Sequence, residues 1–208
     1  MKQLFSIFLV FSLLACKNKT EKTFVLPSDD EINSIVEAVI YQDSLPVLKD
    51  STLFQRYRKN TDKLSVDLRK IKLIFPDKTL KIQPPPPPNS LSVSDLLNLM
   101  LNGNRFFNKN DSLGIVYQNE HIKSFIIDER ISIKVLATTY VEERKKRETL
   151  NNIQYYDLSI PIFSTDRKRA YVEVNFNCSG LCGGGEAIYL EKINNKWKIV
   201  DKKMTWIS

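Results

Sequence analysis

Residues 169–208 read RAYVEVNFNCSGLCGGGEAIYLEKINNKWKIVDKKMTWIS, the most regular pattern in the chain. Val172, Val174 and Phe176 alternate with polar or amphipathic neighbours, and a period of two is typical of a strand with one buried face. The glycine-rich residues 178–185 then turn the chain back on itself.

Two further strands follow in the same segment. Ile188 and Leu190 continue the alternation in a second strand. The pair Asn194-Asn195 is typical of a tight hairpin turn, and a third strand that contains Trp197 runs toward residue 208. The pattern therefore predicts an antiparallel β-meander in this part of the chain.

Two helices are expected in the N-terminal half. Residues 28–41 begin with Ser28 and Glu31 at the spacing of a capping box, in which each side chain satisfies the other residue's backbone N–H. A stripe at helical spacing follows, made of Ile32, Ile35, Val36, Val39 and Ile40. Residues 92–102 carry a second stripe before Gly103, a typical helix stop. Its members are Leu96, Leu97, Met100 and Leu101.

Shorter patterns assign the remaining segments. Strands are expected within residues 51–75, 113–117, 121–127 and 132–136. Five consecutive prolines at residues 84–88 predict a stiff polyproline loop. The charged residues 141–152 predict a solvated helix or loop.

These patterns predict an α+β fold: two N-terminal-half helices pack on a curved antiparallel sheet that ends in the C-terminal β-meander. The sequence has 208 residues, of which 42% are hydrophobic and 26% charged, which excludes a wholly disordered chain or a multi-span membrane protein. We find no internal repeat and no sign of a second hydrophobic core, so we expect one domain over residues 24–208.

Residues 1–15 are typical of an export signal. Lys2 precedes the apolar run LFSIFLVFSLL at residues 4–14. That run is shorter than the roughly 20 residues that a membrane-spanning helix needs. It ends in Leu13-Leu14-Ala15-Cys16, which resembles the lipobox of a bacterial lipoprotein. The alternative is an ordinary secretory signal cut nearby, which would leave Cys16 as a free thiol.

The lipobox resemblance implies cleavage before Cys16 and lipidation of Cys16, with a diacylglycerol on the thiol and a fatty acid such as palmitate on the amine. Such chains anchor a protein without a transmembrane helix. Residues 16–23 would form a flexible tether. Lys17 is not the Asp that retains lipoproteins in the inner membrane, so the resemblance implies an outer-membrane anchor with the domain facing the periplasm.

Cys178 and Cys182 allow three interpretations. Three intervening residues can bring the Cα atoms within the roughly 4.4–6.8 Å of a disulfide, and such bonds persist in an oxidising periplasm. A redox site fits less well, because thioredoxin-like sites use Cys-x-x-Cys at a helix N-terminus. A zinc site fits least, because only His121 and a carboxylate could complete four ligands. We expect a structural disulfide, and neither a metal nor another cofactor.

Other candidate chemistry is sparse. The chain has one histidine, His121, which excludes a multi-histidine metal site. Two carboxylate pairs could serve acid–base chemistry, Asp128 with Glu129 and Glu173 with Glu186, but each is equally consistent with surface charge. The triple glycine at residues 183–185 lacks the Lys-Ser/Thr of a phosphate-binding loop and precedes a strand.

The two tryptophans are expected to anchor the C-terminal strands to the rest of the fold. Trp197 alternates with Lys196 and Lys198, which places the indole and the lysines on opposite faces. Trp206 would tie down a segment that otherwise frays.

The C-terminal residues also resemble the signature of a group of uncharacterised bacterial secreted proteins and lipoproteins. The motifs are SIPIFS at residues 159–164, CxxxCGxG from Cys178, KWKIV from Lys196 and WIS from Trp206. This group brings no established activity, so the resemblance informs fold and export. The helix and sheet pattern is also similar to cystatin-like and nuclear-transport-factor-like folds, in which the sheet forms a cone.

Two functions fit these expectations. The first is a lipid-anchored, non-catalytic envelope module that binds a protein or a small apolar ligand. The second is a periplasm-facing enzyme with a cavity in a cone-shaped sheet, in which Asp, Glu, Tyr or His121 would line the cavity. The net charge of +7 is spread along the chain, so we expect membrane contact through Cys16 and no nucleic-acid partner.

Overall fold

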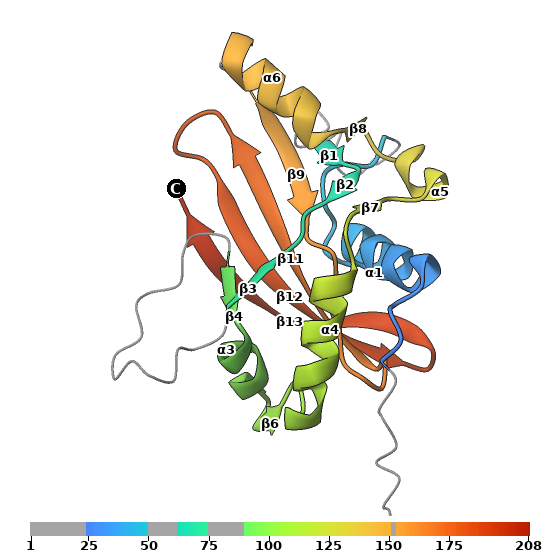
Figure 1. The fold of residues 1–208 in the computed structure, drawn as a ribbon. Helices are drawn as coiled ribbons and strands as arrows, with labels where there is room; N and C mark the ends of the chain where they lie inside the picture. Colours follow the sequence, from blue (N-terminus) through green and yellow to red (C-terminus); the bar gives the residue numbers. More distant parts are fainter. Residues whose placement is uncertain (1–23, 50–61, 75–89, 151–152) are drawn as a thin grey trace, which may run out of the picture.

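The computed structural model describes residues 24–49, 62–74, 90–150 and 153–208 (Figure 1). Its centre is a seven-stranded sheet in the order β13-β12-β11-β9-β1-β8, with β10 paired to β11. Helices lie against this sheet, and the predicted α+β class is confirmed. Cys16 and the prolines at residues 84–88 lie outside the described residues.

The C-terminal meander is confirmed in detail. It consists of β11 (Arg169–Cys178), β12 (Gly184–Ile193) and β13 (Lys196–Ile207), each antiparallel to the next. Asn194 and Asn195 both have positive φ angles, 51° and 60°, as a two-residue hairpin requires.

The other half of the sheet is mixed, whereas an antiparallel sheet was expected. β9 (Gln154–Leu158) is antiparallel to β11, and β10 is Ile162–Phe163. β1 (Lys63–Ser65) lies parallel to both β9 and β8 (Ala137–Thr138). Parallel pairing joins strands that are far apart in the sequence, so no local sequence pattern predicts it.

Helix α1 (Asp29–Gln42) forms as the sequence predicts. The Ser28 side chain accepts a hydrogen bond from the Glu31 backbone N–H, and the Glu31 side chain accepts one from the Ser28 backbone N–H. The predicted apolar stripe is buried and packs with β11 and β12 residues such as Val172, Ile188 and Leu190. Trp197 belongs to the same cluster and is 6% exposed, as expected of an anchor.

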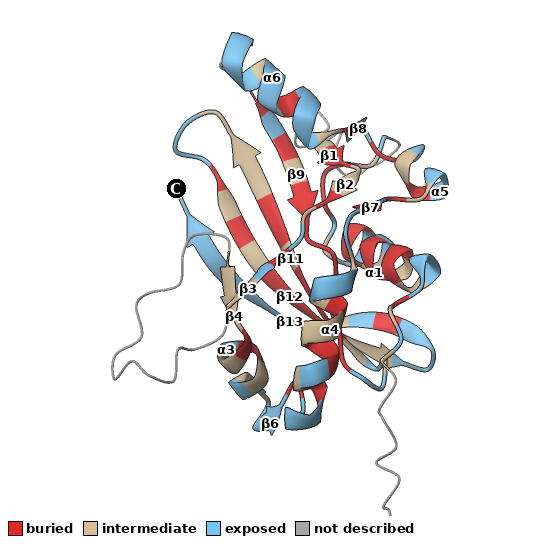
Figure 2. Ribbon diagram, viewed as in Figure 1, coloured by how far each residue is buried: buried red, intermediate tan, exposed pale blue. Residues whose placement is uncertain are grey.

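A second apolar cluster, which was not expected, lies on the opposite face of the sheet. Tyr171 and Tyr189 pair across β11 and β12 and pack with Phe106, Phe107 and Ile115. The strand that was expected to be half-buried is therefore buried on both faces over its first half (Figure 2).

The second expected helix is shorter than predicted. Helix α3 (Val93–Asn98) ends before the hairpin of β5 (Met100–Leu101) and β6 (Asn104–Arg105). Asn102 and Gly103 form its turn with φ angles of 50° and 78°. Gly103 thus serves a two-residue hairpin, for which Asn-Gly is a strong signal, rather than a helix stop.

The strand expected at residues 113–117 is wrong, because that segment lies in helix α4 (Ser112–His121). A 3₁₀ turn, η2 (Lys109–Asp111), leads into it through a capping box between Asn108 and Asp111. Gly114 allows a close approach, since a Cβ there would lie 2.9 Å from Thr165 Oγ1. The capping box before the helix and the close packing at Gly114 therefore outweigh the strand propensity of this segment.

The next segments are also shorter than expected. The one strand within residues 121–127 is β7 (Phe125–Ile126). Residues 132–136, of which Ser132 still belongs to α5 (Glu129–Ser132), form no strand. The expected strands of residues 62–74 divide among different sheets. Besides β1, they are β2 (Asp67–Leu68), paired with β7, and β3 (Lys72–Ile74), paired with β4 (Ser90–Ser92).

Helix α6 (Tyr140–Leu150) carries the charged run, as expected for a solvated helix, and lies at the margin of the fold (Figure 1). No helix in the described part of the chain is long and apolar enough to cross a membrane.

Candidate functional site

An open cleft of about 840 Å³ lies between α6, the segment of β1 and β2, and the ends of β9, β11 and β13. Its size falls in the range of about 300–1,000 Å³ that is typical of ligand sites. The cleft occupies the same sheet face as Tyr171 and Tyr189, beyond the end of their apolar cluster. One side of the sheet therefore changes along its strands from a filled core to an open polar surface.

The floor of the cleft is a single row of residues across four strands. Across the strands, Trp206 on β13 pairs with Gly185 on β12, and Gly185 pairs with Asn175 on β11. Asn175 in turn pairs with Asp157 on β9. Asn177 and Tyr155 form the next row toward the strand ends. Because these neighbours are fixed by strand pairing, the floor is rigid.

Hydrogen bonds link the floor into one network. Trp206 Nε1 donates to Asn175 Oδ1 at 2.9 Å, and Asn175 Nδ2 donates to Asp157 Oδ1 at 3.0 Å. Asn177 Nδ2 donates to the second oxygen of Asp157 at 2.6 Å. Both carboxylate oxygens of Asp157 are thus occupied as acceptors.

Arg69 joins this network from the segment beside β2. Its Nε donates to Asp157 Oδ1 at 3.2 Å and its Nη2 donates to Glu173 Oε2 at 2.7 Å, while Tyr171 Oη donates to the other Glu173 oxygen. Burial opposes the charge of Arg69, but the bonds and attraction of Glu173 and Asp157 prevail and raise its pKa. Among the described residues, nothing accepts a hydrogen bond from the buried Arg69 Nη1.

Helix α6 forms one wall of the cleft with Tyr140, Arg144 and Arg147. It is docked through a carboxylate, because the Glu143 side chain is fully buried. That side chain accepts hydrogen bonds from three donors, Lys63, Thr138 and Lys146, at 3.1, 2.7 and 2.9 Å. Burial alone would raise the pKa of Glu143, but these bonds outweigh it and lower the pKa.

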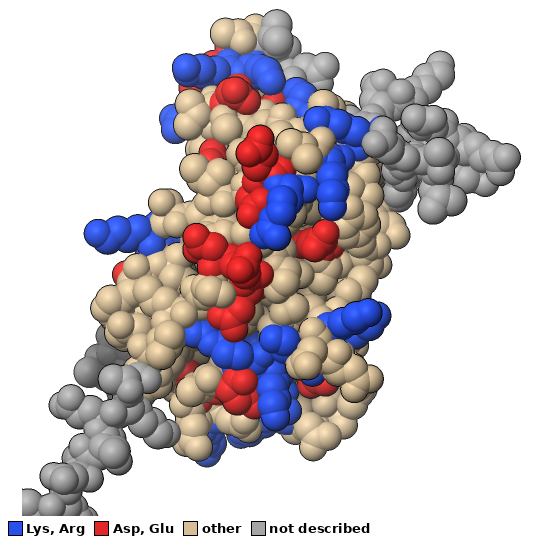
Figure 3. Space-filling model, turned by 90° about the vertical axis from the view of Figure 1, so that its right-hand side faces the viewer, with Lys and Arg blue, Asp and Glu red and all other residues tan. Residues whose placement is uncertain are grey.

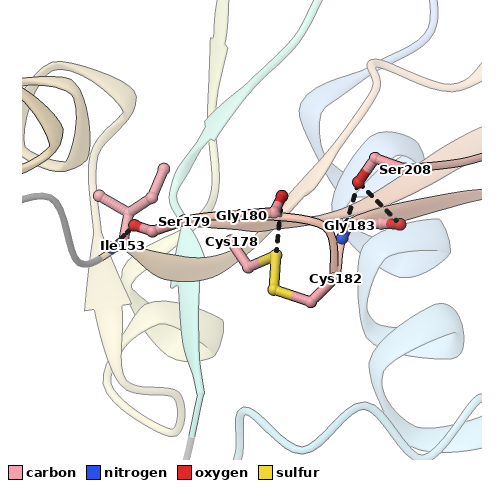
Figure 4. Close-up of a disulfide and its surroundings, with 7 residues drawn as sticks. All are labelled: Ile153, Cys178, Ser179, Gly180, Cys182, Gly183 and Ser208. Atoms are coloured by element: carbon pink, nitrogen blue, oxygen red, sulfur yellow. Dashed lines mark hydrogen bonds between the residues drawn. A yellow bond between two sulfur atoms is a disulfide. The ribbon is translucent and has the colours of Figure 1, made fainter.

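The loop after β11 forms the rim of the cleft. Figure 4 shows its disulfide and the hydrogen bonds on either side. Cys178 and Cys182 lie at disulfide distance, with bonded sulfur atoms and Cα atoms 5.9 Å apart. Ser179 exchanges two hydrogen bonds with the backbone of Ile153 on one side of the loop. On the other side, the Gly183 N–H donates to Ser208 Oγ at 3.0 Å.

The glycines after Cys182 make room for the Trp206 indole. A Cβ on Gly185 would overlap Trp206 Nε1 and lie 2.7 Å from Asn175 Oδ1, and a Cβ on Gly183 would lie 3.0 Å from the indole. At Gly184 the nearest atom would be the Trp206 carbonyl oxygen at 3.6 Å, an ordinary contact. Two of the three glycines therefore form the seat on which the indole lies.

Trp206 is not the buried anchor that the sequence predicts. The residue remains 37% exposed and lines the cleft. Its indole covers the glycine backbone with one face, because strand register sets it opposite Gly185, where there is no side chain to pack against.

The other candidate residues do not meet in one place. His121 is exposed on α4, where its ring stacks on Tyr117 at 4.0 Å, outside the cleft. Asp128 accepts from the Arg130 side chain and backbone, a capping role at α5. Glu173 supports the floor through Arg69, whereas Glu186 lies near Lys202.

Sequence reasoning missed the residues that build the cleft. Its surfaces come from four separated segments: 65–70, 140–148, 153–183 and 206–208. The one local signal was polarity inside the β11 pattern, since Asn175 and Asn177 occupy the alternating positions that Tyr171 occupies earlier.

A shallower groove of about 520 Å³ lies between α1 and the β12–β13 hairpin. Its walls have opposite charge, with Asp30 and Glu37 on the helix and Lys192 and Lys196 on the hairpin. The molecular face turned toward the viewer in Figure 3 also mixes acidic and basic side chains, without a single-sign field of the kind that binds polyanions. Within the described ranges, no group of three or more His, Cys, Asp or Glu residues could hold a metal ion.

No family model, curated protein or solved structure matches this chain. What the cleft binds must therefore be inferred from its own residues.

Proposed function

We propose that this protein is a lipid-anchored module of the cell envelope that binds a ligand in the polar cleft without catalysis. The observation that carries the proposal is the cross-strand floor of Asp157, Asn175 and Trp206, which strand register and mutual hydrogen bonds hold in place. Side chains that are already held in place lose less conformational entropy when a ligand binds.

Binding is favoured over catalysis by the state of the floor carboxylate. Asp157 accepts hydrogen bonds from Arg69 and Asn175 at Oδ1 and from Asn177 at Oδ2, so its carboxylate is engaged in holding the floor together. General acid–base catalysis needs a carboxyl or imidazole within reach of the substrate proton. His121 lies on α4, away from the cleft. Asp67 and Glu148 also line the cleft, and Glu148 forms an ion pair with Arg144 on α6. We therefore rank the enzyme hypothesis second.

The envelope location rests on the N-terminal sequence and on the resemblance to bacterial lipoproteins. Residues 1–15 would be removed, Cys16 would carry the lipid, and residues 16–23 would tether the domain to the periplasmic side of the outer membrane. The cysteine pair of the cleft rim is consistent with an oxidising compartment.

A ligand screen on the full-length protein in detergent tests the binding proposal. We expect ligand-observed NMR of a fragment library to detect binding to the wild type and no binding to Asn177→Trp, whose indole would fill the floor. The matched control is Tyr41→Trp, an aromatic change at an exposed position on α1. Absence of binding to the wild type, or equal binding to Asn177→Trp, would contradict the proposal.

Mass spectrometry of the mature protein tests the anchor. The expected N-terminus is an acylated Cys16, and Cys16→Ser should release the protein from the membrane fraction. An unacylated start at any later residue would contradict lipidation.

A further inference from the structure

The chemistry of the cleft identifies a class of ligand. We infer that the cleft takes a carbohydrate, with one sugar ring stacked on Trp206 and its hydroxyls bonded to the floor. This inference rests on the proposed binding function and adds to it the identity of the ligand class.

The stacking surface is the Trp206 indole. Its lower face covers Gly183 and Gly185, and its ring nitrogen is tied to Asn175, so the plane cannot rotate freely. The residue is nonetheless 37% exposed within the cleft. A fixed, half-exposed aromatic plane matches the flat C–H face of a pyranose, whose hydrogens are attracted to the negative π face.

The hydrogen-bonding groups beside the indole suit hydroxyls. The floor presents amides, a carboxylate and a guanidinium joined by hydrogen bonds, and it combines donors with acceptors. Among the described residues, Asp157 Oδ2 accepts a single hydrogen bond, from Asn177, and the Tyr155 phenol also lines the cleft. Each sugar hydroxyl both donates and accepts, so a ring can match such a mixed surface at several points.

Other ligand classes fit this floor less well. Charged residues of both signs line the cleft, so an anion would meet no single-sign field: the carboxylates are Asp67, Glu148 and Asp157, and the cations are Arg69, Lys70, Arg144 and Arg147. The guanidinium of Arg69 is already shared between two carboxylates. An apolar ligand would remove the polar floor from water without replacing its hydrogen bonds, which is costly. A neutral, hydroxyl-rich ligand avoids both penalties.

The opposite wall extends the site. Tyr140 on α6 is 54% exposed and lines the cleft, so the occupant can contact aromatic surface on two sides. A cleft of about 840 Å³ has room for more than one sugar ring, and its open sides allow a chain to enter and leave.

A glycan array followed by calorimetry tests the inference on the full-length protein in detergent. We expect the array to show binding to a defined set of oligosaccharides, and calorimetry to give a dissociation constant for the best of them. Trp206→Ala should weaken that binding roughly tenfold or more, the scale of one lost aromatic contact, and Tyr140→Ala should weaken it less.

Tyr41→Ala, an exposed aromatic position on α1, is the matched control and should leave the affinity unchanged. Since Trp206→Ala could unfold the C-terminal strands, the milder Tyr140→Ala keeps the test valid. An empty array, or saccharide binding that neither cleft variant weakens, would overturn the inference. If fragments occupy the cleft while no saccharide binds, only the ligand class is wrong, whereas a cleft that binds neither also contradicts the proposed function.

Discussion

Gly185 has no side chain, and the Trp206 indole occupies the space that a Cβ would fill. We predict that Gly185→Ala displaces the indole from Asn175, lowers the thermal midpoint and alters tryptophan fluorescence, because the clash involves a rigid ring rather than a flexible side-chain end. Gly184→Ala is the matched control, since its Cβ would meet only an ordinary contact at 3.6 Å. Equal effects of the two substitutions would show that the indole does not depend on this seat.

The cysteine pair allows a second prediction about single residues. Thiol counting under denaturing, non-reducing conditions should find neither Cys178 nor Cys182 free. Replacing both by Ser should lower the free energy of unfolding by about 2 kcal/mol, because the closed loop is short. Unchanged stability together with two free thiols would contradict a structural disulfide.

These residues mark what a local pattern can and cannot predict. The spacing of Cys178 and Cys182 and the capping box of Ser28 and Glu31 act within a few residues, and the structure places them as expected. The seat of Trp206 could not be predicted, because the glycine that matters lies opposite it on a neighbouring strand.

Among the elements of the fold, two glutamines act as surrogate strand partners. Gln118 on α4 donates to the Phe163 carbonyl at 2.9 Å and accepts from the Phe163 N–H at 3.1 Å. Gln42 at the end of α1 does the same for β13, bonding the Trp197 carbonyl and the Ile199 N–H. Both amides satisfy strand-edge groups that would otherwise need another strand.

We predict that Gln118→Leu lowers the free energy of unfolding by roughly 1–3 kcal/mol, because it leaves a buried N–H and carbonyl without partners. Chemical denaturation measures the change. Glu120→Leu, at an exposed position of the same helix, should have little effect and serves as the control. A Gln118→Leu protein as stable as the control would show that water replaces the amide.

Helix α6 depends on Glu143 in a pH-dependent way. Its pKa is lowered in the folded state, so its contribution is present above the ordinary carboxyl pKa and is lost as the pH falls through the folded value. Glu143→Gln should destabilise the protein at pH 7 by roughly 1–3 kcal/mol and flatten the acid side of the stability profile. Glu148→Gln, exposed on the same helix, should do neither, and identical profiles for both variants would contradict the docking role of Glu143.

Helices were predictable where one signal dominated. Helix α1 has a cap and a regular stripe, whereas α4 has Ile115, Val116 and Tyr117 in succession, which resemble a strand. Its helical state depends on the turn before it and on contact of Gly114 with Thr165. That contact joins distant segments, so periodicity alone led to the wrong assignment.

For the molecule as a whole, the sequence predicts the class and the meander but not the two-sided use of the sheet. α1 covers one face, and the other face divides between an apolar cluster and the cleft. Tyr171 and Asn175 lie on the same face of β11, yet one is core and the other is site, because α4 and its neighbours cover only the first half of the strand.

Three tyrosines, Tyr155, Tyr171 and Tyr189, lie on that face of the sheet, between the apolar cluster and the cleft. Burial, reinforced by Asp157, raises the pKa of Tyr155 to about 12, and burial, reinforced by Asp201, raises the pKa of Tyr189 to about 12. Burial and the Glu173 carboxylate also raise the pKa of Tyr171. All three phenols are therefore held neutral in the folded state.

The sign of the pH dependence follows from these shifts. Above pH 10 the unfolded chain loses phenol protons that the folded protein retains up to about pH 12, so stability falls as the pH rises through this window. Each such group contributes a slope of up to about 1.4 kcal/mol per pH unit. Phenolate absorbance should show fewer than eight tyrosines ionised until the protein unfolds. Chemical denaturation between pH 8 and about 11.5 measures how the free energy of unfolding falls with pH. The fall should be less steep for Tyr155→Phe and Tyr189→Phe than for Tyr41→Phe, and equal slopes for all three variants would mean that this face of the sheet is open to solvent.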